Sequence, residues 1–521
     1  MIKIRQIKID VLRNQKEELN FEVKRILHTE NIEKLNIVKR SIDARKKDHV
    51  YYVYEVDVLV KNEKEILNKT KNPNVLLANE TKYVFPKHRK LDESPIIVGM
   101  GPAGLFSAYI LVENGYKPII IERGEPVEKR VATIEKFWEE NKLNPESNVQ
   151  FGEGGAGTFS DGKLNTLTKD KFGRAKKVFE IFVENGAPEE ILYVNNPHIG
   201  TDVLRTVIVN IRNKIIKMGG QVFYNTKLTD LFIENNELTA IEINNEKRIP
   251  CKNLILAIGH SARDTFELLF NKKLNMEPKP FAVGIRIEHP QKIININQYG
   301  EKYADKLEPA SYKLTYTTKK GRGVYSFCMC PGGYVVNASS EKNRLVTNGM
   351  SNYKRDTENA NSALIVTIGP KDFGNNPLDG VNFQRNLEEK AYKIGKGYIP
   401  ISLYKDYKEN KVSTKLGKVN LLAKGKTTFA NLNEIFPEYI NESLKEGIEN
   451  FGTKIKGFNR DDAILLGVEA RTSSPLRIFR DENGLSNIKG IYPCGEGAGY
   501  AGGITTSAID GIKTAELLTR V

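Results

Sequence analysis

Short runs of alternating apolar and polar residues fill the first ninety positions of the chain. They predict strands over residues 2–12, 34–43 and 50–60, a helix over 15–28, a short polar helix and a last strand around Tyr83–Phe85. This order is typical of a small ferredoxin-like α+β domain. The charged residues that follow, 86–93, lack periodicity and are typical of a linker.

A purely apolar run, Pro95–Val98, then changes the pattern, because such a strand must be buried on both faces. It leads into Gly99–Gly104, a helix ending near Gly115, and a second apolar strand ending on Glu122. Glycines at this spacing permit a tight turn, a close approach to a pyrophosphate and close helix packing, and an acid about 20 residues on accepts a ribose hydroxyl. The stretch predicts a dinucleotide-binding turn that takes an unphosphorylated ribose.

The later periodicities predict a mixed α/β fold. A helix over 198–220 precedes three strand-like runs that we expect to form a meander, at 221–224, 228–233 and 238–243. Residues 251–260 form an apolar strand that closes on small residues, as a central parallel strand does. The segment 276–455 has no second dinucleotide turn and is expected to be an inserted substrate domain, with strands at 281–287, 322–330, 334–337 and 363–368 and a helix at 383–394.

Glycines are densest in Phe151–Asn165, and a second cluster lies in Gly490–Gly503, just before a last helix from about Ile504 to Leu518. Dense glycines leave backbone amides free to bind an anion and let a planar ring approach the main chain. The apolar anchors of the first cluster favour a ligand-binding loop over a flexible linker. The half-charge at the start of the last helix would act on the same ligand.

Composition sets the broad class. A chain of 521 residues should divide into about three domains. No apolar run reaches the length of a membrane span, the first residues lack a signal-peptide pattern, and four cysteines cannot build a disulfide framework over this length. We therefore expect a cytoplasmic protein without membrane contact.

The net charge of +14 is concentrated in part on residues 1–90, which hold 21 Lys and Arg against 13 Asp and Glu. A basic lobe attracts anionic partners, including nucleic acid. A solvated lysine-rich surface is favoured here, because no aromatic and basic RNA-binding motif accompanies the charge.

Four pieces of the chain, in order, resemble the flavoproteins with a glutathione-reductase-type FAD domain: the turn at Gly99–Gly104, the acid Glu122, the strand 254–259 and the motif 490–497. More specifically, the stretches 144–165, 325–333 and 467–475 resemble an orphan family of bacterial FAD-dependent dehydrogenases. The resemblance covers nearly the whole chain. It departs from the pattern at Glu496, where many relatives carry aspartate.

The resemblance implies an α/β fold with four parts: an N-terminal ferredoxin-like domain (1–90), a discontinuous Rossmann-like FAD-binding domain (91–275 and 456–521) and the inserted α+β domain (276–455). It implies FAD as cofactor and no metal. The residues expected at FAD are Gly99, Gly101, Pro102, Ala103, Gly104, Glu122, Arg123, Gly154, Gly155, Gly157, Thr158, Ser160, Asp161, Leu228, Ala257, Gly259, Gly495, Glu496, Gly502, Gly503 and Ile504.

Three residues are candidates for catalysis. Lys163 is placed to stabilise negative charge on reduced flavin, His260 to move a proton, and Arg471 to bind a substrate carboxylate or phosphate. His260 as a structural histidine and Arg471 in a surface or interdomain salt bridge remain open alternatives. Further acid-base candidates are His198, His289 and Tyr334, while Cys328 and Cys330 are expected to be two small, inert core or strand residues rather than a redox couple.

These residues predict a cytoplasmic FAD-dependent oxidoreductase that transfers hydride at flavin N5 to or from a small or medium-sized organic substrate. Without a second nucleotide fold, NAD(P)H is expected only as a transient electron donor. Two alternatives remain: a flavoenzyme that holds RNA through its basic N-terminal lobe, and a flavin-binding scaffold that recruits a protein partner. The oligomeric state is left open.

Overall fold

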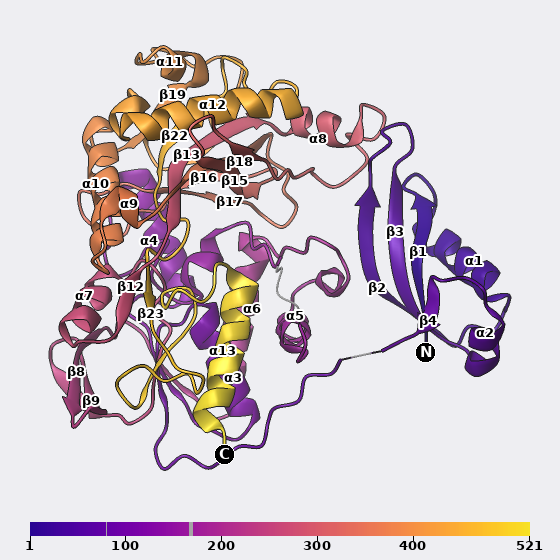
Figure 1. Ribbon diagram of the computed structural model, residues 1–521, viewed down its shortest axis with the longest axis horizontal. Coiled ribbons are helices and arrows are strands. Elements are labelled where there is room, and N and C mark those ends of the chain that lie inside the picture. Colours follow the sequence, from indigo (N-terminus) through magenta and orange to yellow (C-terminus); the bar gives the residue numbers. More distant parts are fainter. Residues whose placement is uncertain (80, 166–169) are drawn as a thin grey trace.

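The computed structural model describes residues 1–79, 81–165 and 170–521, and it is a mixed α/β protein with parallel and antiparallel sheets (Figure 1). An N-terminal lobe stands beside a larger body, and residues 81–95 lead from one to the other. In the described ranges, no helix is both long and apolar enough to cross a membrane.

The N-terminal lobe has the element order expected from the sequence, β-α-β-β-α-β. Its elements are β1 (Ile2–Asp10), α1 (Gln15–Leu27), β2 (Lys34–Asp43), β3 (Tyr51–Leu59), α2 (Glu63–Lys69) and β4 (Val75–Leu77). The sheet order β2-β3-β1-β4, antiparallel throughout, is that of a ferredoxin-like unit. Alternate residues of β1 and β3 bury their side chains against α1.

The last strand of this lobe was wrongly predicted at Tyr83–Phe85. The fourth strand is Val75–Leu77, and Tyr83 and Phe85 instead pack on the core of the parallel-sheet region. The Tyr83 hydroxyl donates to Glu516 there, 3.0 Å away. Their alternating apolar pattern therefore reflects packing against another domain. A local pattern does not distinguish such packing from pairing in a strand.

A parallel five-stranded sheet lies at the centre of the body, in the order β24-β11-β5-β6-β7. The strands are β5 (Ile96–Val98), β6 (Ile119–Ile121), β7 (Gln221–Phe223), β11 (Leu254–Leu256) and β24 (Ile491–Pro493). The helices α3 (Pro102–Glu113), α6 (Thr201–Lys217) and α13 (Ile504–Thr519) contribute to the apolar core beside it, and α3 packs directly on α13. Segments about 400 residues apart in sequence therefore lie side by side (Figure 1).

The predicted meander is wrong in its first member. Residues 221–223 form the edge strand of the parallel sheet beside β6, reached by a crossover through α6. The remaining strands, β8 (Leu228–Glu234), β9 (Glu237–Ile243) and β10 (Lys247–Pro250), form an antiparallel sheet of their own. A three-residue apolar run after a helix is compatible with either sheet. Only the strand with which it pairs shows which sheet it joins.

A seven-stranded sheet carries the second half of the body. Its order is β14 (Thr315–Thr317), β15 (Gly323–Cys330), β18 (Asn359–Ile368), β13 (Phe281–Pro290), β22 (Ile464–Glu469), β19 (Ile399–Leu403) and β21 (Thr427–Phe429). The long helix α12 (Glu438–Lys454) packs on it (Figure 1). Because β22 pairs with β13 and β19, the predicted boundary at residue 455 falls before the last strand of this sheet.

The other elements connect these layers. Small sheets are formed by β17 (Thr347–Met350), β16 (Tyr334–Asn337) and β20 (Ala423–Lys424), and by β12 (Met276–Pro278) and β23 (Leu476–Ile478). The remaining helices are α4 (Val127–Glu140), α5 (Arg174–Glu184), α7 (Arg263–Asn271), α8 (Gln291–Tyr299), α9 (Pro370–Phe373), α10 (Asp379–Ile394) and α11 (Tyr404–Lys408), with 3₁₀ turns at Gly155–Phe159, Glu189–Leu192 and Leu432–Glu434.

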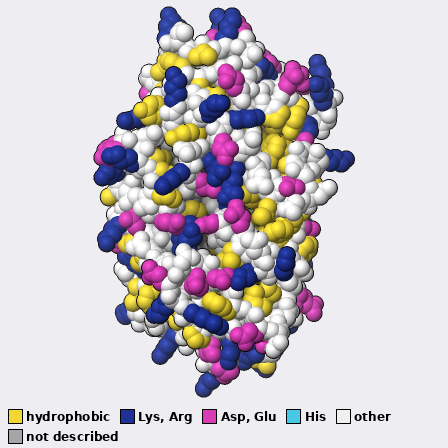
Figure 2. All heavy atoms as spheres, turned by 90° about the vertical axis from the view of Figure 1, so that its left-hand side faces the viewer, with side chains coloured by type: hydrophobic (Ala, Val, Ile, Leu, Met, Phe, Trp, Pro, Cys, Tyr) yellow, Lys and Arg dark blue, Asp and Glu magenta, His cyan; other side chains and the backbone are white. Residues whose placement is uncertain are grey.

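The face of the body turned away from the N-terminal lobe carries basic and acidic side chains in close alternation, with small groups of hydrophobic ones between them (Figure 2). A surface of mixed sign produces no strong single-sign field. The excess positive charge therefore gives this face no basic patch for nucleic acid.

Candidate functional site

A cavity of about 590 Å³ lies between the parallel sheet and the seven-stranded sheet. This volume is within the roughly 300–1,000 Å³ of small-molecule sites. Most of the predicted site residues line it: Gly99, Gly101, Pro102, Ala103, Glu122, Arg123, Gly155, Gly157, Ser160, Asp161, Lys163, Leu228, Ala257, Gly259, His260, Arg471, Glu496, Gly502, Gly503 and Ile504. The fold thus gathers residues from both ends of the chain around one space.

Four predicted residues stand behind the cavity wall: Gly104, Gly154, Thr158 and Gly495. Their surroundings explain why. A Cβ at Gly104 would lie 2.0 Å from the carbonyl oxygen of Gly99, and one at Gly495 would lie 2.7 Å from Cβ of Ala103. Thr158 is fully buried and its hydroxyl donates to Glu153. These residues shape the wall by packing and do not face the cavity.

The turn between β5 and α3 has the form that the glycine spacing predicts. Gly99 has φ +97°, and a side chain there would meet the carbonyl of Ala257 on the neighbouring strand. Gly101 is different, because it has ordinary φ and the nearest protein atom to an added Cβ is 3.8 Å away. Gly101 is therefore free of packing constraints and open to the cavity, at the start of a helix whose amides point into it.

Glu122 ends β6 at the cavity wall, and backbone amides hold its carboxylate. Oε2 accepts from the Met100 amide at 2.8 Å, and Oε1 accepts from the amides of Gly124 and Gly152, both at 2.9 Å. A carboxylate has about four lone-pair directions. Three are used in tying the two glycine-rich segments together, which leaves one for a ligand hydroxyl.

Arg123 is held rigidly beside this acid. Its guanidinium makes a two-point contact with Asp264, donates to Glu146 and stacks 4.0 Å over the Phe151 ring. Most of its N–H donors are therefore used within the protein, and the planar guanidinium forms a flat part of the cavity wall.

The glycine-rich loop after residue 151 lies against the β5–α3 turn. Gly152, Gly154, Gly155 and Gly162 all have positive φ, and a Cβ on Gly155 would lie 3.0 Å from Cα of Gly101. Only glycine adopts these conformations readily, and only glycine permits this backbone approach.

The polar residues of this loop differ in how far they are buried. Asp161 is buried, accepts from Arg355 Nε at 2.9 Å, and also accepts from Arg355 Nη2 and the Ser351 hydroxyl. Although burial would raise the pKa of Asp161, Arg355 and Lys163 lower it below its usual value. The Nζ of Lys163 lies 3.7 Å from Asp161 at a partly exposed position on the cavity wall.

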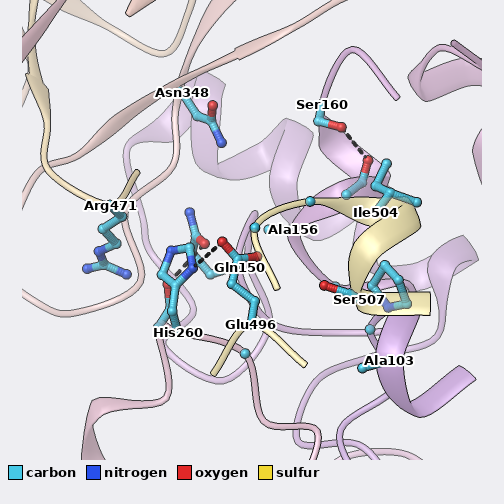
Figure 3. A pocket seen from close by; sticks show the side chains of 18 of the residues that line it. Ala103, Gln150, Ala156, Ser160, His260, Asn348, Arg471, Glu496, Ile504 and Ser507 are labelled. Atoms are coloured by element: carbon cyan, nitrogen blue, oxygen red, sulfur yellow. Dashed lines mark hydrogen bonds and ion pairs between the residues drawn. The ribbon is translucent and has the colours of Figure 1, made fainter. Parts of the chain in front are cut away.

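Helix α13 begins at the cavity. Gly502 and Gly503 precede it, and an added Cβ at either would meet nothing within 4 Å. The Thr505 hydroxyl donates to the carbonyl of Leu164 at 2.8 Å, which anchors the helix start to the glycine-rich loop. Figure 3 shows Ile504 and Ser507 of this helix facing the same space as Ala103 of α3. Two helix N-termini thus converge on one cavity.

His260 and Glu496 point toward one another (Figure 3). The Nδ1 atom of His260 lies 3.1 Å from Oε1 of Glu496, a close contact that does not meet hydrogen-bond geometry. Both ring nitrogens are shielded from solvent and have no hydrogen-bond partner among the described residues. Because a buried polar atom without a partner requires a ligand or water, this residue of the cavity wall keeps unused hydrogen-bonding capacity.

Arg471 lies in the interdomain salt bridge that the sequence left open. It donates through Nε and Nη2 to the two Glu388 oxygens at 2.9 and 2.8 Å, and through Nη1 to Ser340 at 2.5 Å. Glu388 also accepts two hydrogen bonds from Arg263 at the start of α7. Burial alone would raise the pKa of Glu388, but the two guanidiniums lower it to about 2. The network joins α10 to the parallel-sheet region and holds Arg471 at the cavity.

Sequence reasoning missed Glu388, although one signal was present. The buried positions of α10 include Gln384, Leu387, Glu388 and Ala391, so an acid stands on the inward stripe of an amphipathic helix. An unpaired carboxylate is strongly disfavoured there, and its presence implies a cationic partner from elsewhere.

Cys328 and Cys330 are strand residues, as expected, because both lie on β15. Both line the cavity, where Cys330 is buried and Cys328 is exposed. The register of β15 against β18 shifts between Phe327 and Cys330, and Cys328 takes φ +41° in this bulge. Desolvation by the surrounding walls raises the pKa of the Cys328 thiol to about 12, so it is a neutral thiol at pH 7.

Of the other acid-base candidates, none lines the cavity. His198 stacks on Tyr353 and bonds its carbonyl at 2.9 Å. His289 is fully buried against the carbonyl of Phe458, and burial lowers its pKa to about 4. Tyr334 lies under Lys424. These positions are structural.

Comparisons with known proteins agree with this architecture. Residues 280–472 match the family described as "FAD-dependent protein, C-terminal domain-like", and residues 1–59 match a "Domain of unknown function (DUF8436)". An "Uncharacterized protein" of Clostridium beijerinckii is 50% identical over 495 residues, which is 94% of this chain and 92% of that one.

Solved structures resemble the chain more distantly. Glycine oxidase from Bacillus cereus is 12% identical over 82% of this chain and 94% of its own, with a TM-score of 0.35. L-proline dehydrogenase from P. horikoshii is 14% identical over 82% and 93%, with a TM-score of 0.34. Halogenase PltM is 9% identical over 81% and 67%, with a TM-score of 0.38. Similarity at this level assigns no substrate. The match to the Clostridium beijerinckii protein does assign a family: the chain belongs with that protein, and through residues 280–472 it carries the C-terminal domain of FAD-dependent proteins.

Proposed function

We propose that this protein is an FAD-dependent oxidoreductase that acts on a small or medium-sized organic substrate. The observation that carries the proposal is the convergence of two helix N-termini, α3 and α13, on one glycine-lined cavity with an acid at the end of β6. Helix N-termini bind anionic groups, and an acid in this position binds a ribose hydroxyl. The match of residues 280–472 to FAD-dependent proteins supports the same cofactor.

The parts of FAD have separate holders in this proposal. The amides of Gly101 and Ala103 would hold the pyrophosphate, and the remaining lone pair of Glu122 the adenosine ribose. The ring system would lie against Gly155, Gly157 and Ser160 of the glycine-rich loop and against Gly502 to Ile504. The parallel sheet with its helices then forms a discontinuous Rossmann-like FAD-binding domain of glutathione-reductase type, interrupted by the seven-stranded sheet.

Bound FAD would supply hydride transfer at flavin N5. The chain's own residues would orient the reacting groups and stabilise the charge that develops on them. The start of α13 and Lys163 would stabilise negative charge on the ring system, and His260 would hold or release a proton at Nε2. Arg471 keeps Nη protons not used by Glu388 or Ser340 and would orient substrate at the wall.

The same reasoning bears on location and donor. Four free cysteines suit a reducing compartment, which supports the proposed cytoplasmic location. NADPH or NADH remains a proposed transient donor. The RNA alternative gains no support from the open face of the N-terminal sheet, where Lys3 lies between Glu55 and Asp57 at 3.2 and 3.1 Å. These ion pairs neutralise the face that such a domain would offer to RNA.

The proposal is tested by purifying the protein and recording its visible spectrum, then adding NADPH and NADH anaerobically. We expect bound FAD, with either rapid bleaching by a nicotinamide or reduction by substrate alone. Gly101→Ala should lose FAD while melting as the wild-type apoprotein does, because its methyl occupies only the ligand's space. Gly369→Ala is the matched control, with equally open surroundings outside the cavity. A protein that neither retains nor rebinds FAD would refute the proposal.

A further inference from the structure

The carboxylates on the cavity wall are already matched by the protein. Backbone amides hold Glu122, Arg355 holds Asp161, and Glu496 lies beside His260. The fourth, Glu469, is bound by the buried Arg286 at 2.9 Å. Each of the four therefore has a partner within the protein.

Two lysines that line the cavity, the exposed Lys313 and the partly exposed Lys163, have no carboxylate to themselves. Lys313 lines the cavity and makes no ion pair or hydrogen bond among residues 1–79, 81–165 and 170–521. Lys163 lies 3.7 Å from Asp161, but both oxygens of that carboxylate are already taken by Arg355. The cavity therefore holds positive charge that the protein does not balance.

The two lysines flank one place. The pairing of Thr315 with Tyr325 and the hydrogen bond from Ser326 N to Leu314 O continue the register so that Lys313 stands opposite Phe327. Cys328 is the next residue, and the charge of Lys163 acts on its thiol. Lys313 thus approaches the bulge of β15 from the β14 side, and Lys163 approaches it from the glycine-rich loop.

Lys163 lies beside the predicted ring end of the cofactor, and the rest of this place lies across the cavity from the other predicted dinucleotide positions. Glu122 and the α3 start belong to the parallel sheet, whereas Lys313, Phe327 and Cys328 belong to the seven-stranded sheet on the opposite wall. The lining around the lysines includes the Tyr312 and Phe327 rings. A ligand there would present an anionic group to the lysines and an apolar body to the rings.

We propose that Lys163 and Lys313 form an anion subsite beside β15, and that the substrate of this protein is an organic carboxylate with an apolar portion. The inference rests on the proposed function and narrows it to a substrate class. An ammonium is a point donor with three protons, so two of them suit the two oxygens of one carboxylate. The neutral thiol of Cys328 adds no repulsion at pH 7.

The test uses the FAD-loaded protein and two pairs of probes, benzoate with benzamide and acetate with acetamide. Each pair has the same shape and differs in charge. Binding is read from the perturbation of the flavin spectrum at low and high salt. We expect each anion to bind at least about tenfold more tightly than its amide, as a charge-assisted hydrogen bond implies, and the preference to shrink with salt.

Lys313→Met should remove about tenfold of benzoate affinity while leaving benzamide affinity and FAD content unchanged. Lys320→Met is the matched control, because Lys320 lies in the same hairpin and is exposed as Lys313 is, but it lies outside the cavity lining and is paired with Glu442. Equal binding of acids and amides, or an unchanged benzoate affinity in Lys313→Met, would overturn the proposal. Equilibrium dialysis of labelled benzoate gives the same comparison without flavin, so a failure to hold FAD refutes the proposed function separately from this inference.

Discussion

The two walls of the cavity are built on opposite principles. The wall from the parallel sheet is made of backbone, where Gly99, Gly101 and Gly155 bring main-chain atoms to the surface. The wall from the seven-stranded sheet carries charged side chains, of which Arg471 is balanced by a partner distant in sequence, Glu388, while Lys313 has no ionic partner among the described residues. The first wall provides backbone groups and shape, and the second provides side-chain charges on which the proposed substrate preference rests.

The sharpest way to break the second wall is Glu388→Ala. It leaves Arg263 and Arg471 buried with only the partly exposed Glu341 as a carboxylate partner, and removing one partner of a buried ion pair costs about 3–5 kcal/mol. We expect this loss in the free energy of unfolding by urea. Glu442→Ala, which removes an exposed partner of Lys320, should cost less than about 1 kcal/mol. Equal losses in the two variants would show that the network contributes no more than a surface pair.

The first wall is tested by Gly104→Ala, whose methyl would overlap the Gly99 carbonyl at 2.0 Å. Overpacking of this kind costs about 1–3 kcal/mol, so the melting temperature and FAD content should both fall. Gly101→Ala should lower FAD content, with a melting temperature equal to that of the wild-type apoprotein, whereas Gly104→Ala should melt below it. The distinction between a packing glycine and a ligand-facing glycine disappears if both variants melt like the wild type.

The charge pattern also predicts a pH dependence. Glu388 has its pKa lowered from 4.5 to about 2 in the folded state, so it contributes stability above pH 4.5 that is lost as pH falls toward 2. The stability difference between wild type and Glu388→Gln should therefore shrink by roughly 2 kcal/mol between about pH 6 and pH 3, given 1.36 kcal/mol per unit. Urea unfolding at each pH measures it, and a constant difference would mean that Glu388 titrates normally.

The smallest expected effect belongs to Lys163, where the two walls meet. Lys163→Met removes a cation from the ring end of the cavity and should lower the flavin reduction potential by roughly 10–30 mV, about 1 kcal/mol for two electrons. Lys163→Arg keeps the charge and should stay near the wild-type potential. If the Met variant shows an unchanged potential, Lys163 has no electrostatic role at the flavin.

The sequence predicted the glycine-rich wall of the cavity better than it predicted which segments come together. The turn at Gly99–Gly104 and the loop after Phe151 were found from residues alone, because a conformation that only glycine adopts leaves a local mark. The errors concerned which segments pack or pair with one another. Tyr83 and Phe85 proved to pack on another domain, and residues 221–223 proved to join the parallel sheet.

The sequence by itself determined the local backbone: the ferredoxin-like element order, the dinucleotide turn and the helix that begins after Gly503, since each is set by periodicity and by residues next to one another. Tertiary structure alone decided which charges meet. Arg471 and Glu388 are 83 residues apart, and Lys163 and Lys313 are 150 apart in number, so no spacing rule connects them. Whether a charge is balanced depends on which residues are close in the folded structure. The tertiary structure therefore decides the proposed preference of the cavity for an anion.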